Sequence, residues 1–195
     1  MSRWQPDARG RLERAALELF ARQGFAETTV PEITAEAGLT TRTFFRHFAD
    51  KREVLFAAEA GLPPFIAQLL AEAPAELGPY DTLAHSLETV AATRFDGLLD
   101  FLIARRAVIR SDAGLREREL RKQEVLAEAI EQGFLDRGVD EVTSSLVGRM
   151  AAVVFNVSLD RWLDLGGSRT LLDLMHEHLT LTRVTFAATP PAHSS

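Results

Sequence analysis

The ten residues at positions 39–48, LTTRTFFRHF, bring cationic, hydroxyl and aromatic side chains together in one short stretch. Guanidinium groups bind phosphate oxygens or the edge of guanine, and an aromatic ring packs against a thymine methyl group. On a helix, Arg42, Phe45 and Arg46 share one side, whereas Phe44 points elsewhere. We therefore expect Phe44 to anchor a short helix in a core, while the cationic side of that helix meets a polyanion such as DNA.

Side chains for other chemistry are few. The chain has no cysteine, which excludes disulfides, thiolate nucleophiles and zinc–thiolate sites. His176 and His178 flank one glutamate, but positions two apart on a helix point about 200° apart, so the two rings cannot chelate one metal ion. Arg94, Arg105 and Arg106 are interpreted as surface charge, with an acidic ligand as the alternative. We expect no metal, no cofactor and no enzymatic activity, because no nucleophile with a base, carboxylate cluster or phosphate loop is evident.

The net charge of −6 is unevenly distributed along the chain. Residues 1–52 carry nine Lys and Arg against seven Asp and Glu, giving +2, and the remaining residues give −8. A basic head on an acidic body suits a protein of which one end contacts a polyanion, although ordinary variation in charge explains the asymmetry equally well. The longest uninterrupted apolar run, residues 150–155, is far shorter than the roughly 20 residues of a spanning helix, so we expect a soluble cytoplasmic protein.

Helical periodicity predominates along the chain, and no strand is predicted. A first apolar stripe ends at Gly24, and TVPE, which begins at Thr29, is a capping box that opens a second helix. Gly38 then makes a turn and Thr40 caps a third helix, while Asp50 opens a fourth. A short helix, a glycine turn and a second short helix predict a helix-turn-helix, whose second helix enters the major groove of DNA.

Residues 15–55 resemble the N-terminal DNA-binding domain of TetR-family transcriptional regulators. The resemblance covers about a quarter of the chain, and the positions that carry it are Phe20, Gly24, Phe25, Thr29, Ile33, Ala37, Gly38, Thr43, Phe48 and Lys51. It implies a homodimer that binds a palindromic operator, usually as a repressor, and is released by a small-molecule effector in its C-terminal domain. A transcriptional activator of the same fold and a helical interaction protein without DNA binding are the alternatives.

The resemblance also implies roles for single residues. It suggests base contacts from Thr41 and Arg42, although phosphate contact alone remains open for Arg42. Thr29 and Lys51 stand at expected helix N-termini, where free amides favour an anion. Phe45 replaces a tyrosine that is common in the family, which removes one possible phosphate hydrogen bond. The candidate DNA-binding residues are Thr29, Thr41, Arg42, Thr43, Phe45, Arg46, His47 and Lys51.

The fold class expected is all-α, with an N-terminal three-helix helix-turn-helix domain followed by a helical bundle. The sequence GLPPF at residues 61–65 interrupts the helical pattern, because proline lacks an amide donor. We therefore expect a DNA-binding domain at 1–62, a ligand-binding and dimerisation domain at 63–188, and a disordered tail at 189–195. Arg3 and Trp4 belong either to a frayed terminus or to a minor-groove arm.

The expected helix at residues 140–165 carries two apolar stripes on nearly opposite sides. One stripe should face its own bundle and the other a second subunit, but the pattern does not decide which. The stripe that contains Phe155 and Trp162 is the alternative candidate for the surface that faces the second subunit. The candidate dimer residues are Leu146, Met150, Val153, Val154 and Val157, with Leu171, Met175 and Leu179 from the last helix.

A small, largely apolar effector is expected among the helices of the second domain. The candidate ligand-binding residues are Phe95, Phe101, Phe134, Phe155 and Asn156. These rings supply more aromatic volume than a slim bundle usually needs, although they also suit an ordinary core. Asn156 offers either a polar anchor for the ligand or a buried hydrogen bond.

Overall fold

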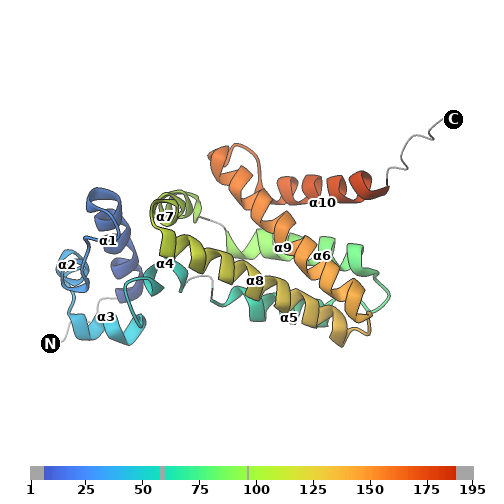
Figure 1. Ribbon diagram of the computed structural model, residues 1–195, viewed down its shortest axis with the longest axis horizontal. Helices are drawn as coiled ribbons and strands as arrows, with labels where there is room; N and C mark the ends of the chain where they lie inside the picture. Colours follow the sequence, from blue (N-terminus) through green and yellow to red (C-terminus); the bar gives the residue numbers. More distant parts are fainter. Residues whose placement is uncertain (1–6, 58–59, 96, 188–195) are drawn as a thin grey trace. The chain divides into compact units, whose positions relative to one another are not determined.

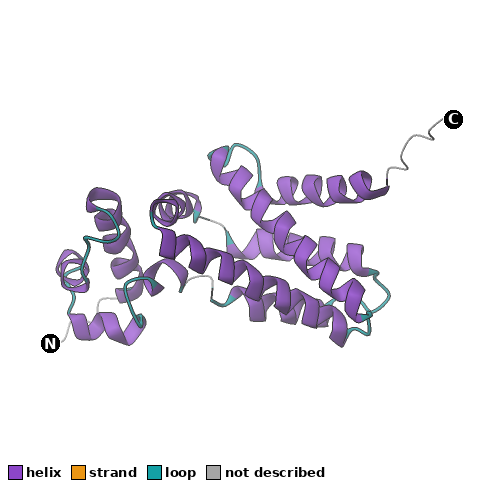
Figure 2. Cartoon of the chain, in the orientation of Figure 1, coloured by secondary structure: helices purple, strands orange, loops and turns teal. Residues whose placement is uncertain are grey.

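The computed structural model describes residues 7–57, 60–95 and 97–187, and the side chains of this part up to residue 185. Throughout this part the chain forms helices and loops, which confirms the expected all-α class (Figure 1, Figure 2). The expected arm at Arg3 and Trp4 and the expected tail at 189–195 lie outside the described residues.

The first four helices are short apart from α1, and the last six are longer. The N-terminal helices are α1 (Ala8–Gln23), α2 (Val30–Glu36), α3 (Thr41–His47) and α4 (Glu53–Phe56). They are followed by α5 (Leu62–Glu72), α6 (Pro79–Arg94), α7 (Leu99–Ser111), α8 (Ala113–Asp136), α9 (Glu141–Asp164) and α10 (Leu171–Ala187). Pro63 and Pro64 lie in the first turn of α5, where amides have no intrahelical acceptor, so the prolines begin this helix.

The chain divides into two compact units, residues 1–62 with 100–122 and residues 63–99 with 123–195. The expected domain division differs from these units, because it assigned residues 100–122 to the second domain. The physical reason is that Val108, Ile109 and Leu115 are buried in one apolar cluster with side chains of α1 to α4. The segment therefore packs with the first unit, and α8 contributes its first turns to one unit and the remainder to the other.

The core of the first unit is built around phenylalanines. Phe44 and Phe48 are fully buried, and their ring centroids lie 5.4 Å apart. α2 and α3 meet at Gly38, which has a φ of +61°, a left-handed conformation that favours glycine. Arg11 of α1 donates to the carbonyl oxygen of Ala37 at the end of α2. These contacts hold the two short helices against α1.

The second unit packs α5, α6, α9, α10 and the end of α8 around buried leucines and Phe134. At Gly148 in α9, a Cβ atom would lie 2.6 Å from the carbonyl oxygen of Ala127, so the close approach of α8 and α9 requires glycine. After a turn at residues 165–168, α10 runs back and contacts both α9 and α6 (Figure 1). Arg137 donates to the carbonyl oxygens of Leu70 and Ala73, which closes the end of α5.

Candidate nucleic-acid interface

The helix α3 has one buried and one exposed side. The backbone amide of Thr43 donates to the hydroxyl of Thr40 at 3.2 Å, which caps the N-terminus of the helix. Phe44 is fully buried beneath the helix, whereas the adjacent Phe45 is 58% exposed. The two neighbouring phenylalanines therefore do face different surroundings, and one ring is presented to whatever binds this helix.

Cationic side chains surround the exposed ring. Arg42 and Arg46 are exposed, and so is Thr41, while Thr43 and His47 are half-buried. Arg46 lies 3.4 Å from the ring nitrogen of His47, a long contact that leaves the remaining guanidinium donors to the solvent. Arg42 makes no hydrogen bond or ion pair with any described residue. The exposed side of α3 therefore combines unsatisfied cationic donors with one apolar ring.

The N-terminus of α2 has the expected capping box. The amide of Thr29 donates to Glu32 Oε2 at 2.7 Å, and the Glu32 amide lies 3.4 Å from the Thr29 hydroxyl. The Thr29 hydroxyl donates to the same carboxylate at 2.7 Å. The hydrogen bond from the Thr29 hydroxyl to the carboxylate lowers the pKa of Glu32 below its ordinary value. The hydrogen bond from the Thr29 amide lowers it further. Thr29 thus remains exposed beside the helix N-terminus, with its hydroxyl proton directed at Glu32.

Lys51 does not have the position expected of a phosphate contact. Its Nζ atom donates to the carbonyl oxygens of Phe25, Ala26 and Thr28 at 2.7, 3.1 and 2.9 Å. It also lies 4.5 Å from the centre of the Phe25 ring. An ammonium group has three donors, so no proton of Lys51 remains for DNA. The direct phosphate contact from this side chain stays a prediction, and in this structure the loop before α2 uses all of its donors.

A buried charged cluster, which the sequence reasoning missed, holds α4 within the first unit. Arg105 is only 5% exposed, so the interpretation of this residue as surface charge is wrong. Its Nε donates to the carbonyl oxygen of Leu55 at 2.5 Å, and its guanidinium pairs with Glu119 at 2.7 Å. Burial raises the pKa of Glu119, but Lys122 and Arg105 together lower it further, so the pKa lies below its ordinary value.

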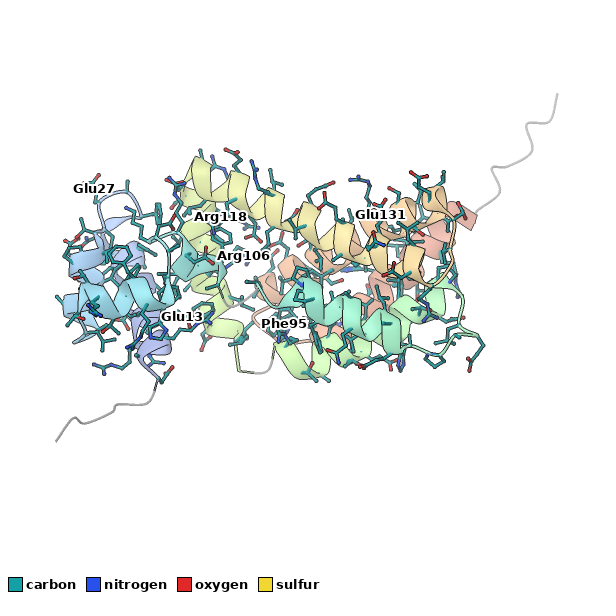
Figure 3. All side chains as sticks on the ribbon, turned by 90° about the horizontal axis from the view of Figure 1, so that it is seen from below. Glu13, Glu27, Phe95, Arg106, Arg118 and Glu131 are labelled. Carbon is teal, nitrogen blue, oxygen red and sulfur yellow. The ribbon has the colours of Figure 1, made fainter. Side chains whose placement is uncertain are left out.

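Phe56 of α4 lies between two guanidinium groups. The Cζ atoms of Arg105 and Arg118 are 5.1 and 5.0 Å from the centre of its ring. Arg118, which is labelled in Figure 3 on the first half of α8, also forms an ion pair with Glu53. Cation–π contacts and ion pairs therefore connect α4 to α7 and α8. The only signal of this cluster in the sequence was that Arg105 lies one helical turn from apolar residues. This spacing does not distinguish a buried arginine from an exposed one.

The second unit exposes a long apolar stripe on α9. Leu146, Val153 and Val157 are 63%, 59% and 50% exposed, and Val142 continues the stripe towards the N-terminus. Met150, which also belongs to the predicted stripe, is half-buried. On α10, Leu181 and Val184 are exposed as well. The structure therefore leaves this side of α9 uncovered, whereas the alternative stripe is mostly buried within its own unit.

Four of the predicted dimer residues are buried within the second unit itself. They are Val154, Leu171, Met175 and Leu179, none more than 5% exposed. Val154 adjoins the exposed stripe but faces inwards, and the three residues of α10 lie on the side that contacts α9 and α6. The expected stripe on α10 was therefore correct as an apolar stripe but wrong as a surface for a partner.

By length and composition, α9 is the one helix in the described part that is apolar enough to cross a membrane. Only 39% of its most apolar window is buried. The combination of a buried side and the exposed stripe accounts for this hydropathy, because both sides of the helix carry apolar residues. The same composition occurs in core helices of soluble proteins.

The candidate ligand residues are divided between several environments. Phe95 lies near Phe155 and Trp162, with ring centroids 5.8 and 6.4 Å from its own. Phe134 is fully buried, and Phe101 packs against the apolar core of the first unit, whereas the aromatic cluster belongs to the second unit. Asn156 donates to the carbonyl oxygen of Ala152 in its own helix at 2.7 Å.

Two hollows border the aromatic cluster of Phe95, Phe155 and Trp162. An open groove of about 460 Å³ is lined by Phe95, Trp162 and the start of α10, together with small residues of α6. A separate apolar cavity of about 20 Å³ is lined by Phe155 and by side chains of α5, α6 and α8. Small-molecule sites usually measure about 300 to 1,000 Å³, so the groove has the appropriate size and the cavity does not.

The two histidines of α10 contact different helices. His176 lies 3.5 Å from a carboxylate oxygen of Glu88, and Nδ1 of His178 lies 2.9 Å from the hydroxyl of Ser158. Within the described ranges, no three His, Cys, Asp or Glu side chains are placed to hold a metal ion. The pair thus makes two separate polar contacts.

Comparison with known proteins gives matches to DNA-binding regulators. A family model described as bacterial regulatory proteins, tetR family, matches residues 13–58. The chain is 36% identical over 92 residues to the HTH-type transcriptional regulator TcmR of Streptomyces glaucescens, which is 47% of this chain and 41% of TcmR. It is 40% identical over 48 residues to the uncharacterized HTH-type transcriptional regulator YerO of Bacillus subtilis (strain 168), 25% of this chain and 17% of YerO. The chain thus spans less than half the length of these relatives.

Solved structures with the same fold cover nearly the whole chain. The TetR-family repressor FadR of Thermus thermophilus, in complex with lauroyl-CoA, has a TM-score of 0.56 at 24% identity over 96% of this chain and 98% of FadR. A TetR-family regulator from Syntrophomonas wolfei has a TM-score of 0.63 at 16% identity, over 96% and 98%. SmeT in complex with triclosan has a TM-score of 0.58 at 20% identity, over 96% and 97%. At these identities the likeness concerns the fold.

Proposed function

We propose that this chain, which belongs to the TetR family of bacterial transcriptional regulators, is a repressor that binds a palindromic operator as a homodimer and is released by a small apolar molecule. The observation that carries the DNA-binding part is the geometry of α3. Phe44 fixes the helix from below, and the exposed side carries Arg42, Phe45 and Arg46. Such a helix can enter the major groove, where arginine binds guanine and an apolar ring contacts thymine.

The roles within this interface follow from exposure and available donors. Arg42 is the candidate for base contact, because its guanidinium has no described partner and lies near the helix N-terminus. Thr43, Arg46 and His47 are candidates for phosphate contact from the same helix. Thr29 is a candidate for phosphate contact through its hydroxyl, whose proton would turn from Glu32 to the phosphate at the start of α2.

The homodimer is proposed from the exposed stripe of α9 and from the exposed Leu181 and Val184 of α10, a helix that packs against α9. Exposed apolar side chains gathered on packed helices are typical of an interface. A second copy is the occupant that such a stripe suits, since a twofold axis places the same apolar residues opposite each other. Two helices from each subunit then form a four-helix bundle, and the twofold symmetry requires a palindromic operator.

The effector site is proposed at the groove beside Phe95 and Trp162. The apolar walls of the groove favour an aliphatic or aromatic ligand. Two solved structures with this fold, FadR and SmeT, are complexes with lauroyl-CoA and with triclosan. Lauroyl-CoA and triclosan are therefore suitable first probes. α8 is the proposed route from ligand to DNA. Its first half forms an ion pair with α4 through Arg118 and Glu53, and its second half lines the apolar cavity, whose Phe155 packs on Phe95 of the groove.

Selection from random duplexes tests the DNA-binding proposal. The purified protein should enrich two half-sites related by twofold symmetry, with centres about one DNA turn, roughly 34 Å, apart. Binding to the enriched duplex should weaken steeply with salt, because phosphate contacts release counterions. Recovery of no preferred sequence, with equally weak binding to every duplex, would exclude an operator-binding function.

A further inference from the structure

The position of Lys51 points to a role that differs from DNA contact. Lys51 follows α3 and precedes α4, yet its ammonium group binds the loop that connects α1 to α2. The bonded residues are 23 to 26 positions away in the chain. One side chain thus connects the segment after α3 to the loop before α2. Both helices of the helix-turn-helix lie between the two connected segments in the sequence.

The loop at residues 24–29 is built to receive this ammonium group. Three carbonyl oxygens converge on Nζ, and the ring of Phe25 packs against the charge. Thr28 is fully buried, and its hydroxyl donates to the carbonyl oxygen of Gly24 at 2.8 Å. The next residue, Thr29, begins the capping box of α2. The ammonium group therefore fixes the segment that sets the position of the α2 N-terminus.

Loss of the ammonium group would leave several acceptors without a donor. Two of the three hydrogen bonds are partly shielded from solvent, and buried acceptors without partners are costly. The loop would relax to expose these carbonyl oxygens to water, and α2 would lose its fixed entrance. Carbonyl oxygens that turn outwards beside α2 would also repel a phosphate group.

We propose that Lys51 is a positioning residue that fastens the α1–α2 loop to the end of the helix-turn-helix and supports DNA affinity without touching DNA. The inference rests on the proposed operator binding for its effect on affinity. The tie itself exists in the DNA-free protein, so it is measurable whether or not the operator proposal holds.

Salt dependence distinguishes positioning from phosphate contact. Each neutralised phosphate contributes a slope of about −0.9 to the plot of log affinity against log salt. A phosphate-binding lysine would therefore flatten that slope when removed. A positioning lysine would lower the affinity by a similar factor at every salt concentration and leave the slope nearly unchanged.

The decisive variants are Lys51→Met and, as a matched control, Arg46→Met, measured on the same enriched operator. Lys51→Met should lose roughly tenfold in affinity at all salt concentrations, because a charged network that positions α2 is removed. Arg46→Met, which removes an exposed cation of α3, should flatten the slope by about one ion. If Lys51→Met flattened the slope as much as Arg46→Met, the positioning role would be refuted.

A measurement on the unaltered side chain covers the case in which Lys51→Met fails to fold. The chain contains two lysines, Lys51 and Lys122, so Lys122→Arg leaves a single lysine and keeps a cation beside Glu119. In NMR spectra of protein with 15N-labelled lysine, the ammonium protons of Lys51 should be protected from exchange with water before DNA is added. The chemical shift of this ammonium group should change little when the operator binds. A signal that gained protection only with DNA would overturn the proposal. Absence of operator binding, together with a protected signal, would refute the proposed function and leave the tie intact.

Discussion

At the scale of single residues, two adjacent phenylalanines show how one helix serves two environments. Phe44 is fully buried and Phe45 is mostly exposed, because successive positions on a helix point about 100° apart. The sequence predicted this division correctly, since the cations cluster on the side of Phe45. It could not predict the state of Lys51, because hydrogen bonds to carbonyl oxygens of a distant loop leave no pattern in the residues themselves.

Replacement of Arg42 by alanine tests the base-reading role of α3. The variant should lose about 1 to 3 kcal/mol of operator binding and relax the preference at one base pair in each half-site, because a bidentate contact to guanine is removed. Affinity for variants of the enriched operator, measured by titration, reports both effects. Arg121→Ala is the matched control, since Arg121 is exposed on α8 and pairs weakly with Glu117. Unchanged base preference in Arg42→Ala would restrict this arginine to phosphate contact.

At the scale of elements, side-chain cations bind carbonyl oxygens near helix ends in both units. Arg137 donates to the carbonyl oxygens at the end of α5, Arg11 does so at the end of α2, and Arg105 does so in α4. The last carbonyl oxygens of a helix have no intrahelical donor, so a long cationic side chain from another element both satisfies them and fixes the packing. The starts of helices are determined by capping residues nearby in the sequence, whereas these arginine–carbonyl hydrogen bonds join residues that are far apart in the sequence.

This difference explains which elements could be predicted. The capping box at Thr29, the turn at Gly38 and the cap at Thr40 act within four residues and are present as expected. The fourth helix begins after Asp50 as expected, because the Asp50 carboxylate accepts from the amides of Arg52 and Glu53, but the pattern around Glu53 contains no signal for the end of α4. The packing of residues 100–122 with the first unit was also unpredictable, since apolar side chains at helical spacing fit either unit.

The charged cluster around Glu119 should make the free energy of unfolding of the first unit decrease at acid pH. Its pKa is lowered in the folded protein, so its contribution to stability is fully present above the unfolded value of about 4.3 and is lost as the pH falls through the folded value. Glu119→Gln should destabilise the protein by roughly 1 to 3 kcal/mol at neutral pH, because Arg105 loses its buried partner. Urea unfolding at fixed protein concentration measures this difference.

The control for the acid dependence is Glu117→Gln, which removes an exposed carboxylate from the same helix. Its unfolding free energy should follow that of the unaltered protein at every pH. The difference between Glu119→Gln and the unaltered protein should shrink as the pH falls from the unfolded value of about 4.3 through the lower folded value. A constant difference over the whole pH range would show that Glu119 acts through packing rather than through its charge.

At the scale of the whole molecule, the exposed stripe of α9 is the surface through which we propose that two copies associate. The sequence showed two apolar stripes, but only the packing of α9 against its own unit shows which of them is left uncovered. The buried residues of α10 illustrate the limit of periodicity, since an apolar stripe at an edge looks the same whether its own chain or a partner covers it.

A charge introduced into the stripe should separate the subunits. Val153→Glu places a carboxylate where the dimer would bury it, and an unpaired buried charge is strongly unfavourable. We expect sedimentation to show a dimer for the unaltered protein and a monomer for Val153→Glu at micromolar concentration. The variant should also lose affinity for the two-half-site operator but bind a single half-site as weakly as the unaltered protein does. Leu120→Glu is the control, because Leu120 is equally exposed on α8 of the first unit. A dimeric Val153→Glu would place the interface elsewhere.

The groove beside Phe95 and Trp162 connects the binding of a ligand to the release of DNA in the proposed cycle. A ligand can shift the equilibrium only by its difference in affinity between the DNA-binding state and the released state. A difference of about 1 to 3 kcal/mol gives ~5- to 150-fold weaker operator binding, which is enough for regulation. The apolar cavity beside Phe155 is too small for such a ligand, so we propose that the groove provides most of the contact surface.

Ala92→Trp tests this assignment, because Ala92 lines the groove and a tryptophan there would fill it. The variant should keep its operator affinity and lose both the thermal stabilisation and the weakening of DNA binding that an effector produces. Ala71→Trp is the matched control, since Ala71 is exposed on α5 and does not line the groove. Compounds that stabilise the unaltered protein in a thermal-shift screen are titrated against the operator complex of each variant. If Ala92→Trp responded to them as fully as Ala71→Trp, the effector would bind outside the groove. If stabilising compounds left the operator affinity of the unaltered protein unchanged, ligand binding and DNA release would be uncoupled, because a ligand with equal affinity for both states shifts neither.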